Sequence, residues 1–289
     1  DGEKAADGKQ QILPVRFALP LLLSKEKRAS EMTDLAALAK AAEQTDGSLL
    51  GTFTGEDLVE TFAPYFMPDI IKDKQLDTEK LRTVLQELQT IAAHCDMVEK
   101  YKKGERASNE WDLPSAMQAV LCQISGFNDA MFDLAIINLV KGDYTSFENA
   151  YIPTVEIGVN ANTKQADLAK EFAAFVMSRE VQDGDFYDGF PVNKESLHMQ
   201  VSLDRSDYAA YTTIEGADGQ EIGLDIEPIK AADADKLEAL CDSLSKKTVK
   251  DAKVLEELEK AVPAYLLGRQ SLDDTISKIQ DGVKIYLAE

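Results

Sequence analysis

Apolar and polar residues follow two different periods along the first hundred residues. Residues 11–17 (QILPVRF) predict a short strand, and Pro14 restricts that strand to a sheet edge or a crossing point because proline lacks a ladder donor. Apolar residues at helical spacing predict a helix over residues 34–43, with Thr33 as its N-cap. A longer amphipathic helix is predicted from Asp77 onward. The pattern indicates a mixture of strands and helices.

A polar stretch at residues 102–116 interrupts these patterns, predicts a loop and contains the only tryptophan, Trp111. After a break at Gly126, the β-rich run FDLAIINLV (132–140) predicts a strand, and residues 152–160 predict another. A helix follows, capped by Thr163 in our prediction; its apolar side consists of Leu168, Phe172, Phe175 and Val176. The succession of strand, turn and helix is the local unit of an α/β fold.

Three helical patterns close the chain. Pro263 is predicted to bend or divide the second of them. The third follows a stop at Gly268 and begins with Ser271 as N-cap and Asp274 in the capping-box position. Helix therefore dominates the composition of predicted elements, with short strands between.

Charge narrows the classes of partner. The chain has 52 acidic and 31 basic residues, a formal net charge of −21, so nucleic acid is not expected as a partner. The sequence contains no run of 18 apolar residues, so no membrane span is predicted. The first residues (DGEKAADGK) lack the apolar stretch of a signal peptide. The sequence leaves two alternatives: a cytoplasmic protein, or one whose export signal has been removed.

The chemistry-bearing residues match no known catalytic or metal motif. Three cysteines and two histidines lack zinc-site spacing, so no metal and no disulfide framework is predicted. Phosphate-binding glycine loops and the G-x-S-x-G nucleophile pattern are missing from the sequence, and no cofactor is predicted. Residues 183–189 (DGDFYDG) resemble a calcium loop, but Tyr187 stands at a ligand position, which favours a solvated turn.

Four stretches, in order along the chain, resemble the bacterial extracellular solute-binding proteins of carbohydrate ABC importers, the maltose-binding-protein-like family. They are DGKQQILPVRFALPLLLSKEK, AMQAVLCQISGFNDAMFDLAIINL, PTVEIGVNANTKQADLAKEFAAFVMSREVQ with GFPVNKESL, and the final GRQSLDDTISKIQDGVKIYLAE. The first is similar to the family's crossing between lobes, the second to its ligand loop, and the last to its closing helix.

The resemblance implies an α/β, two-lobed, type II periplasmic-binding-protein-like fold that is helix-rich with short mixed-sheet strands. Its function would be to bind a carbohydrate between the lobes and deliver it to ABC permease subunits, without catalysis. The protein would be extracellular, a cell-surface lipoprotein of Gram-positive type, attached to the membrane only through a lipid anchor absent from this chain.

The crossing at LPVRF comes unusually early for this family, so we expect a chain that lacks most of the N-terminal lobe. Residues 9–152 and 197–289 would form the C-terminal lobe, and residues 153–196 a remnant strand and helix of the other lobe. Because the remnant's apolar side needs cover, we expect it to pack onto the C-terminal lobe or onto another copy of the chain.

Sugar sites combine aromatic platforms with polar hydrogen-bonding groups. The resemblance places Phe127 as the stacking ring, with Asn128 and Asp129 as polar partners; a core position for Phe127 in an ordinary turn is the alternative. Arg16 and Phe17 at the crossing are further candidates, although a charged residue on an edge strand is often only solvated. Trp111 is predicted either as a second platform or as an anchor of its loop.

Two other classes of function stay open. Paired carboxylates could hydrolyse a glycosidic bond, but 52 acidic residues make any sequence pair uninformative. A sensor or adhesion module could use the same fold and report to a partner protein instead of a transporter.

Overall fold

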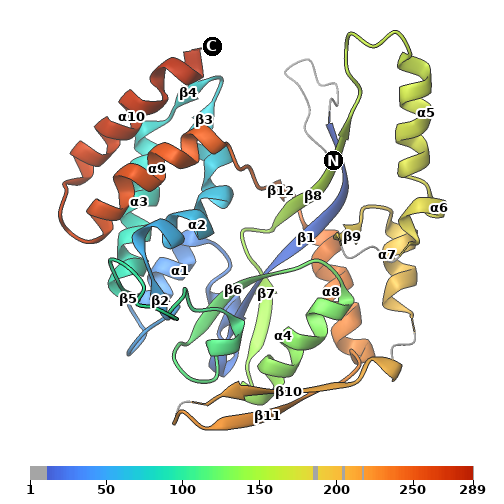
Figure 1. Cartoon of the computed structure of the whole chain (residues 1–289), viewed down its shortest axis with the longest axis horizontal. Helices are drawn as coiled ribbons and strands as arrows, with labels where there is room; N and C mark the ends of the chain where they lie inside the picture. Colours follow the sequence, from blue (N-terminus) through green and yellow to red (C-terminus); the bar gives the residue numbers. More distant parts are fainter. Residues whose placement is uncertain (1–11, 185–187, 204–205, 217, 289) are drawn as a thin grey trace.

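The computed structural model describes residues 12–184, 188–203, 206–216 and 218–288. A mixed sheet forms its centre, and β1 is the central strand (Figure 1). The strands of this sheet are β1 (Ile12–Ser24), β6 (Ala119–Ile124), β7 (Asp143–Ser146), β8 (Ala150–Gly158), β9 (Phe190–Pro191) and β12 (Lys246–Lys247). All pairings with β1 are antiparallel, whereas β12 joins β8 in parallel.

The strand β1 is longer than the sequence pattern predicted. Its first half pairs with β8, from Ile12 opposite Gly158, and its second half lies between β6 and β7. The ladder with β8 has register shifts on both sides of Arg16, near the predicted proline irregularity. One continuous strand thus runs through both halves of the sheet.

Two apolar cores flank this sheet, and the alternation of β1 side chains divides them. Leu22 packs into one core, while Leu21 and Leu23 pack into the other, as expected when successive side chains point to opposite faces. The first core is a helical group, seen at the left of Figure 1. It contains α1 (Leu35–Ala42), α2 (Gly55–Ile70), α3 (Thr78–Ala93), α9 (Ala252–Leu266) and α10 (Leu272–Ala288). Short pairs β2 (Thr52–Phe53) with β5 (Asp96–Met97), and β3 (Ile71–Lys72) with β4 (Gln75–Leu76), adjoin it.

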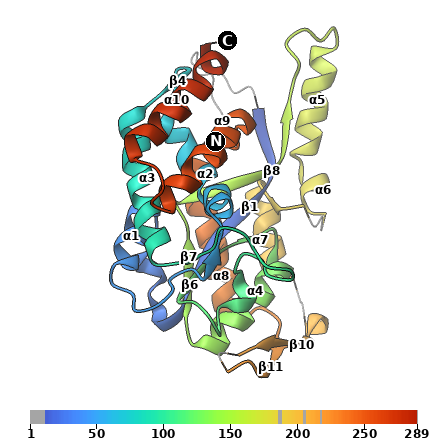
Figure 2. The same cartoon turned by 60° about the vertical axis from the view of Figure 1, so that its left-hand side comes forward.

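The second core lies under α4 (Phe127–Val140) and α8 (Ala231–Ser243). The hairpin of β10 (Ala210–Glu215) and β11 (Glu221–Ile226) closes its outer side, and α7 (Lys194–Val201) lies beside α8 (Figures 1 and 2). The strand predicted over residues 132–140 is wrong, because this run belongs to α4. The sheet and β11 bury apolar residues on several sides of α4, and the exposed side also carries apolar Phe132 and Leu139, so the helix lacks a one-sided pattern.

The helix ends follow the predicted chemistry with small shifts. Asp34 caps α1 in place of Thr33, since its carboxylate accepts from the Ala37 N–H at 2.8 Å. The helix α3 begins at the predicted place, and Asp77 is its N-cap; Ser271 accepts from the Asp274 N–H at 3.1 Å. Gly268 has the positive φ of 70° that a helix stop requires.

Pro263 does not divide α9. The helix continues to Leu266, and the proline packs against Gly55 of α2, where a Cβ would come within 2.6 Å of the proline ring. The proline therefore serves as a close contact between two helices.

Helix α5 (Ala166–Val176) extends away from the two cores, and α6 (Arg179–Gln182) lies between α5 and α7 (Figures 1 and 2). Gln165 precedes α5 as its N-cap in place of Thr163. Leu168, Phe172 and Phe175 are 62%, 58% and 46% exposed, so the described residues leave most of the predicted apolar side of α5 open, although Ala173 of the same helix is buried. Within the remnant 153–196, the strands β8 and β9 pair with β1. Packing of the exposed side of α5, onto the C-terminal lobe or onto another copy, stays a prediction.

Candidate functional site

Arg16 lies on β1 at the register shifts, and its side chain is 2% exposed. Its guanidinium donates to the main-chain carbonyls of Val181 at 3.3 Å, Gly184 at 3.1 Å and Gly189 at 3.5 Å. The Asp188 carboxylate stands 3.8 Å from its Nε. These contacts tie β1 to α6 and to the residues that follow it, and they make Arg16 a structural connector in this conformation. Its predicted contact with a ligand stays a prediction that this burial does not favour.

Phe127 and Phe17 are also buried, at 2% and 8% exposure. Both rings contact Phe190 of β9, with ring centroids 5.3 Å and 5.7 Å away. The three rings form an aromatic cluster between β1, β9 and the start of α4. This arrangement matches the alternative of a core position for Phe127, because a ring at 2% exposure offers no face for stacking in this conformation.

Asn128 and Asp129 follow in the first turn of α4 and are reachable by solvent. Gly126 is the N-cap and supplies no side chain, so the Asp129 carboxylate accepts from the Ser125 N–H at 3.0 Å instead. A carboxylate there is also stabilised by the positive end of the helix dipole. The two polar groups are thus held by a helix start instead of a mobile loop.

Trp111 lies in a short 3₁₀ turn, Glu110–Asp112, that packs against α4 and β6. Asn109 and Asp112 form a capping box around this turn, and Arg106 pairs with the Asp112 carboxylate at 2.8 Å. The half-buried indole meets the Phe132 ring of α4, with centroids 5.8 Å apart. Trp111 therefore anchors its loop and still presents part of its surface.

Phe132 is the site residue that the sequence pattern missed. Its side chain is 38% exposed, and it follows Asn128 by four residues, so both lie on one face of α4. Trp111, Phe132, Asn128 and Asp129 consequently form one exposed patch of aromatic and polar groups, named here the α4 patch. Assigning residues 132–140 to a strand concealed this helical spacing.

A buried carboxyl lies one turn further along the same helix. Asp133 is 6% exposed, and its Oδ2 is 3.5 Å from the Cys122 thiol, which donates to it. Burial first, and then the charge of Glu110, raise the pKa of Asp133 to about 7. Burial likewise raises the pKa of the Cys122 thiol well above its usual value. The interior beneath the α4 patch therefore carries a carboxyl that titrates near neutral pH.

The described residues hold no group of three or more His, Cys, Asp or Glu that could bind a metal ion. The calcium-like stretch 183–189 falls partly on residues 185–187, which lie outside the described residues. Among the described residues, no helix is long and apolar enough to cross a membrane.

Comparison with known proteins places the fold. No protein-family model matches the chain, and no curated protein matches it. A putative oligosaccharide periplasmic-binding protein from Synechococcus matches with a TM-score of 0.59 at 11% identity, over 99% of this chain and 74% of its own. The sugar-binding protein MalE from Xanthomonas citri matches with a TM-score of 0.57 at 12% identity, over 99% and 72%. A sugar transporter from Rhizobium etli in an open conformation matches with a TM-score of 0.56 at 15% identity, over 96% and 73%.

This chain has the solute-binding-protein fold. The mixed α/β, helix-rich architecture expected from the resemblance is therefore confirmed. The chain spans about three quarters of the length of these similar structures. Within the solute-binding-protein fold, the α4 patch lies on the helix that begins beside β9 and the central strand β1.

Proposed function

We propose that this chain is the substrate-binding component of an ABC importer, which binds a carbohydrate and delivers it to a membrane permease. The α4 patch carries the proposal, because two partly exposed aromatic rings stand beside an amide and a carboxylate on rigid elements. Sugars present apolar C–H faces and hydroxyl rims, which such a combination contacts well. The similar structures, a sugar transporter, a putative oligosaccharide-binding protein and a sugar-binding protein, support the same class of ligand.

The proposal divides the predicted residues into two roles. Trp111 and Phe132 would contact the sugar ring, and Asn128 and Asp129 would hydrogen-bond its hydroxyls. Phe127, Phe17 and Arg16 would support the patch and the strand crossing from below. The lobe division at residues 153–196, an extracellular location and attachment as a Gram-positive lipoprotein belong to the same proposal.

Isothermal titration calorimetry against a panel of neutral mono- and oligosaccharides tests the proposal. We expect one or more of them to bind, and we expect Trp111→Ala and Phe132→Ala each to weaken binding by up to about tenfold, since an aromatic contact contributes about 0.5–1.5 kcal/mol beyond the area that it buries. Phe172→Ala is a matched control, because it removes an exposed helical phenylalanine on α5, away from the patch.

Two outcomes would contradict the proposal. If the unaltered chain binds none of the sugars in the panel, the proposal that its ligand is a sugar is refuted. Binding that Trp111→Ala and Phe132→Ala leave unchanged would place the sugar elsewhere. Circular dichroism of each variant verifies that lost binding is not lost folding.

A further inference from the structure

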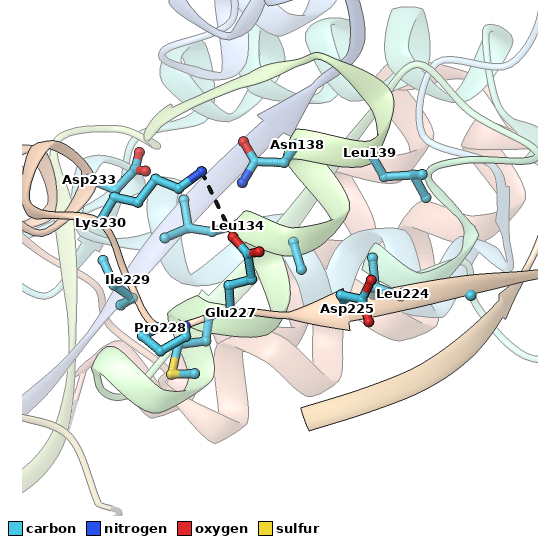
Figure 3. A pocket seen from close by; sticks show the side chains of 13 residues that line it. Leu134, Asn138, Leu139, Leu224, Asp225, Glu227, Pro228, Ile229, Lys230 and Asp233 are labelled. Atoms are coloured by element: carbon cyan, nitrogen blue, oxygen red, sulfur yellow. Dashed lines mark ion pairs between the residues drawn. The ribbon is translucent and has the colours of Figure 1, made fainter. Parts of the chain in front are cut away.

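A hollow lies outside the α4 patch, where the later half of α4 meets β11 and the start of α8 (Figure 3). Its volume is about 420 Å³, within the usual range of small-molecule sites, about 300–1,000 Å³. None of the four α4 patch residues lines it, and its charged groups come from β11, α8 and the residues between them. The hollow is thus separate from the proposed sugar site.

The inner wall of this hollow is apolar. Met131 and Leu134 of α4 and Leu224 of β11 are each less than 10% exposed, and Pro228 and Ile229 complete the wall. An apolar group of a few carbon atoms that enters here would leave water, which contributes about 0.8 kcal/mol for each buried methylene. The wall therefore favours a ligand with a small hydrocarbon part.

The rim is polar and carries charges of both signs. Figure 3 shows the side chains of Lys230, Asn138 and Glu227 pointing toward the same part of the hollow, around Leu134. Lys230 and Glu227 form a loose pair, with Nζ and Oε2 3.9 Å apart and both side chains about 70% exposed. Such a pair has little mutual stabilisation to lose, so a ligand could interact with both charges.

Lys230 is also the N-cap residue of α8, a helix of 13 residues, and its side chain makes no cap hydrogen bond. Asp233 already occupies the first turn of α8, where its carboxylate accepts from the Tyr144 hydroxyl at 3.2 Å, so the ammonium of Lys230 is the positive group that lines this side of the hollow. This side of the hollow suits a carboxylate. Asp225, Glu227 and Asp233 also line it, however, so a simple anion would be repelled.

The combination points to one chemical class. We infer that this hollow binds a free α-amino acid with an apolar side chain, such as leucine. The ligand carboxylate interacts with Lys230 and Asn138; its ammonium interacts with Glu227 and Asp225; its side chain rests on Leu134. A zwitterion satisfies both charges of the rim, whereas an acid or an amine satisfies only one.

Calorimetry with three probes tests this inference: L-leucine, L-leucinamide, which lacks the carboxylate, and 4-methylpentanoate, which lacks the ammonium. We expect L-leucine to bind and each analogue to bind about tenfold or more weakly, because each loses a charge-assisted contact. Equal binding of either analogue, or no binding of L-leucine at millimolar concentration, would overturn the inference.

Two variants locate the site. Lys230→Met and Glu227→Gln should each weaken leucine binding by about tenfold, again through one lost charged contact. Lys250→Met and Glu60→Gln are matched controls, since this exposed pair at 3.0 Å lies on the helical group instead. Unchanged leucine affinity in Lys230→Met would place the amino acid elsewhere and refute the site. Sugar binding is expected to be the same in all four variants, so the two proposals fail independently.

Discussion

Replacing Arg16 by alanine tests how the central strand holds α6 and the residues that follow it. The change removes a guanidinium that donates to three carbonyls, at 3.1 Å to Gly184, 3.3 Å to Val181 and 3.5 Å to Gly189. A hydrogen bond from a charged group contributes about 1.5–3 kcal/mol. If the bond to Gly184 counts in full and the two longer bonds count at half strength, the free energy of unfolding falls by about 3–6 kcal/mol. The Asp188 carboxylate, half exposed and 3.8 Å away, adds little.

Urea denaturation followed by circular dichroism measures the loss of unfolding free energy. Arg16→Lys should lie between the wild-type chain and Arg16→Ala, because an ammonium keeps the charge but cannot span three carbonyls. Arg82→Ala is the control: its exposed pair with Asp273 is 2.7 Å long, and its removal should cost less than about 1 kcal/mol.

Hydrogen exchange locates the effect. The main-chain amides near Gly184 and Gly189 should exchange faster in Arg16→Ala, while those of α3 keep their protection. A loss no larger than that of Arg82→Ala, with unchanged exchange, would refute the connector role of Arg16.

Two further predictions concern stability. The pKa of Asp133, raised from 3.8 to about 7, means that the folded state binds its proton more tightly than the unfolded state. Stability is therefore lost as the pH rises from about 4 to 7, and Asp133→Asn should flatten this decline in urea titrations between pH 5 and 8; an equal decline in the variant would contradict the assignment. Phe172→Ala should change the unfolding free energy by less than about 0.5 kcal/mol, whereas Phe62→Ala, fully buried, should cost about 3–5 kcal/mol. A similar cost for both would mean that α5 is covered in solution.

The sequence predicted those helices whose apolar residues lie on one face only. The helix α3 shows its apolar stripe because one face alone is buried, and Asp77 marks its start by side-chain chemistry. The run 132–140 was predicted as a strand because α4 carries apolar residues on most of its sides and therefore shows no single apolar stripe. The helix α2 was not predicted, because Pro64 and Pro68 both stand inside it.

The candidate site was predicted in part for similar physical reasons. The resemblance named Asn128 and Asp129 and residue type named Trp111; in the structure the Trp111 ring contacts Phe132, which lies one helical turn after Asn128 on α4. The burial of Phe127 depends on Phe190, more than sixty residues later, and no local pattern contains that contact. Arg16 likewise finds its acceptors far along the chain.

The continuous course of β1 has a mechanical consequence. The register shifts of its ladder with β8 flank Arg16, so the regular pairing of β1 is interrupted there. A rotation of the α5 side relative to the two cores would therefore bend β1 at Arg16. The guanidinium of Arg16 is hydrogen-bonded to Val181, Gly184 and Gly189, so these residues would move together with β1.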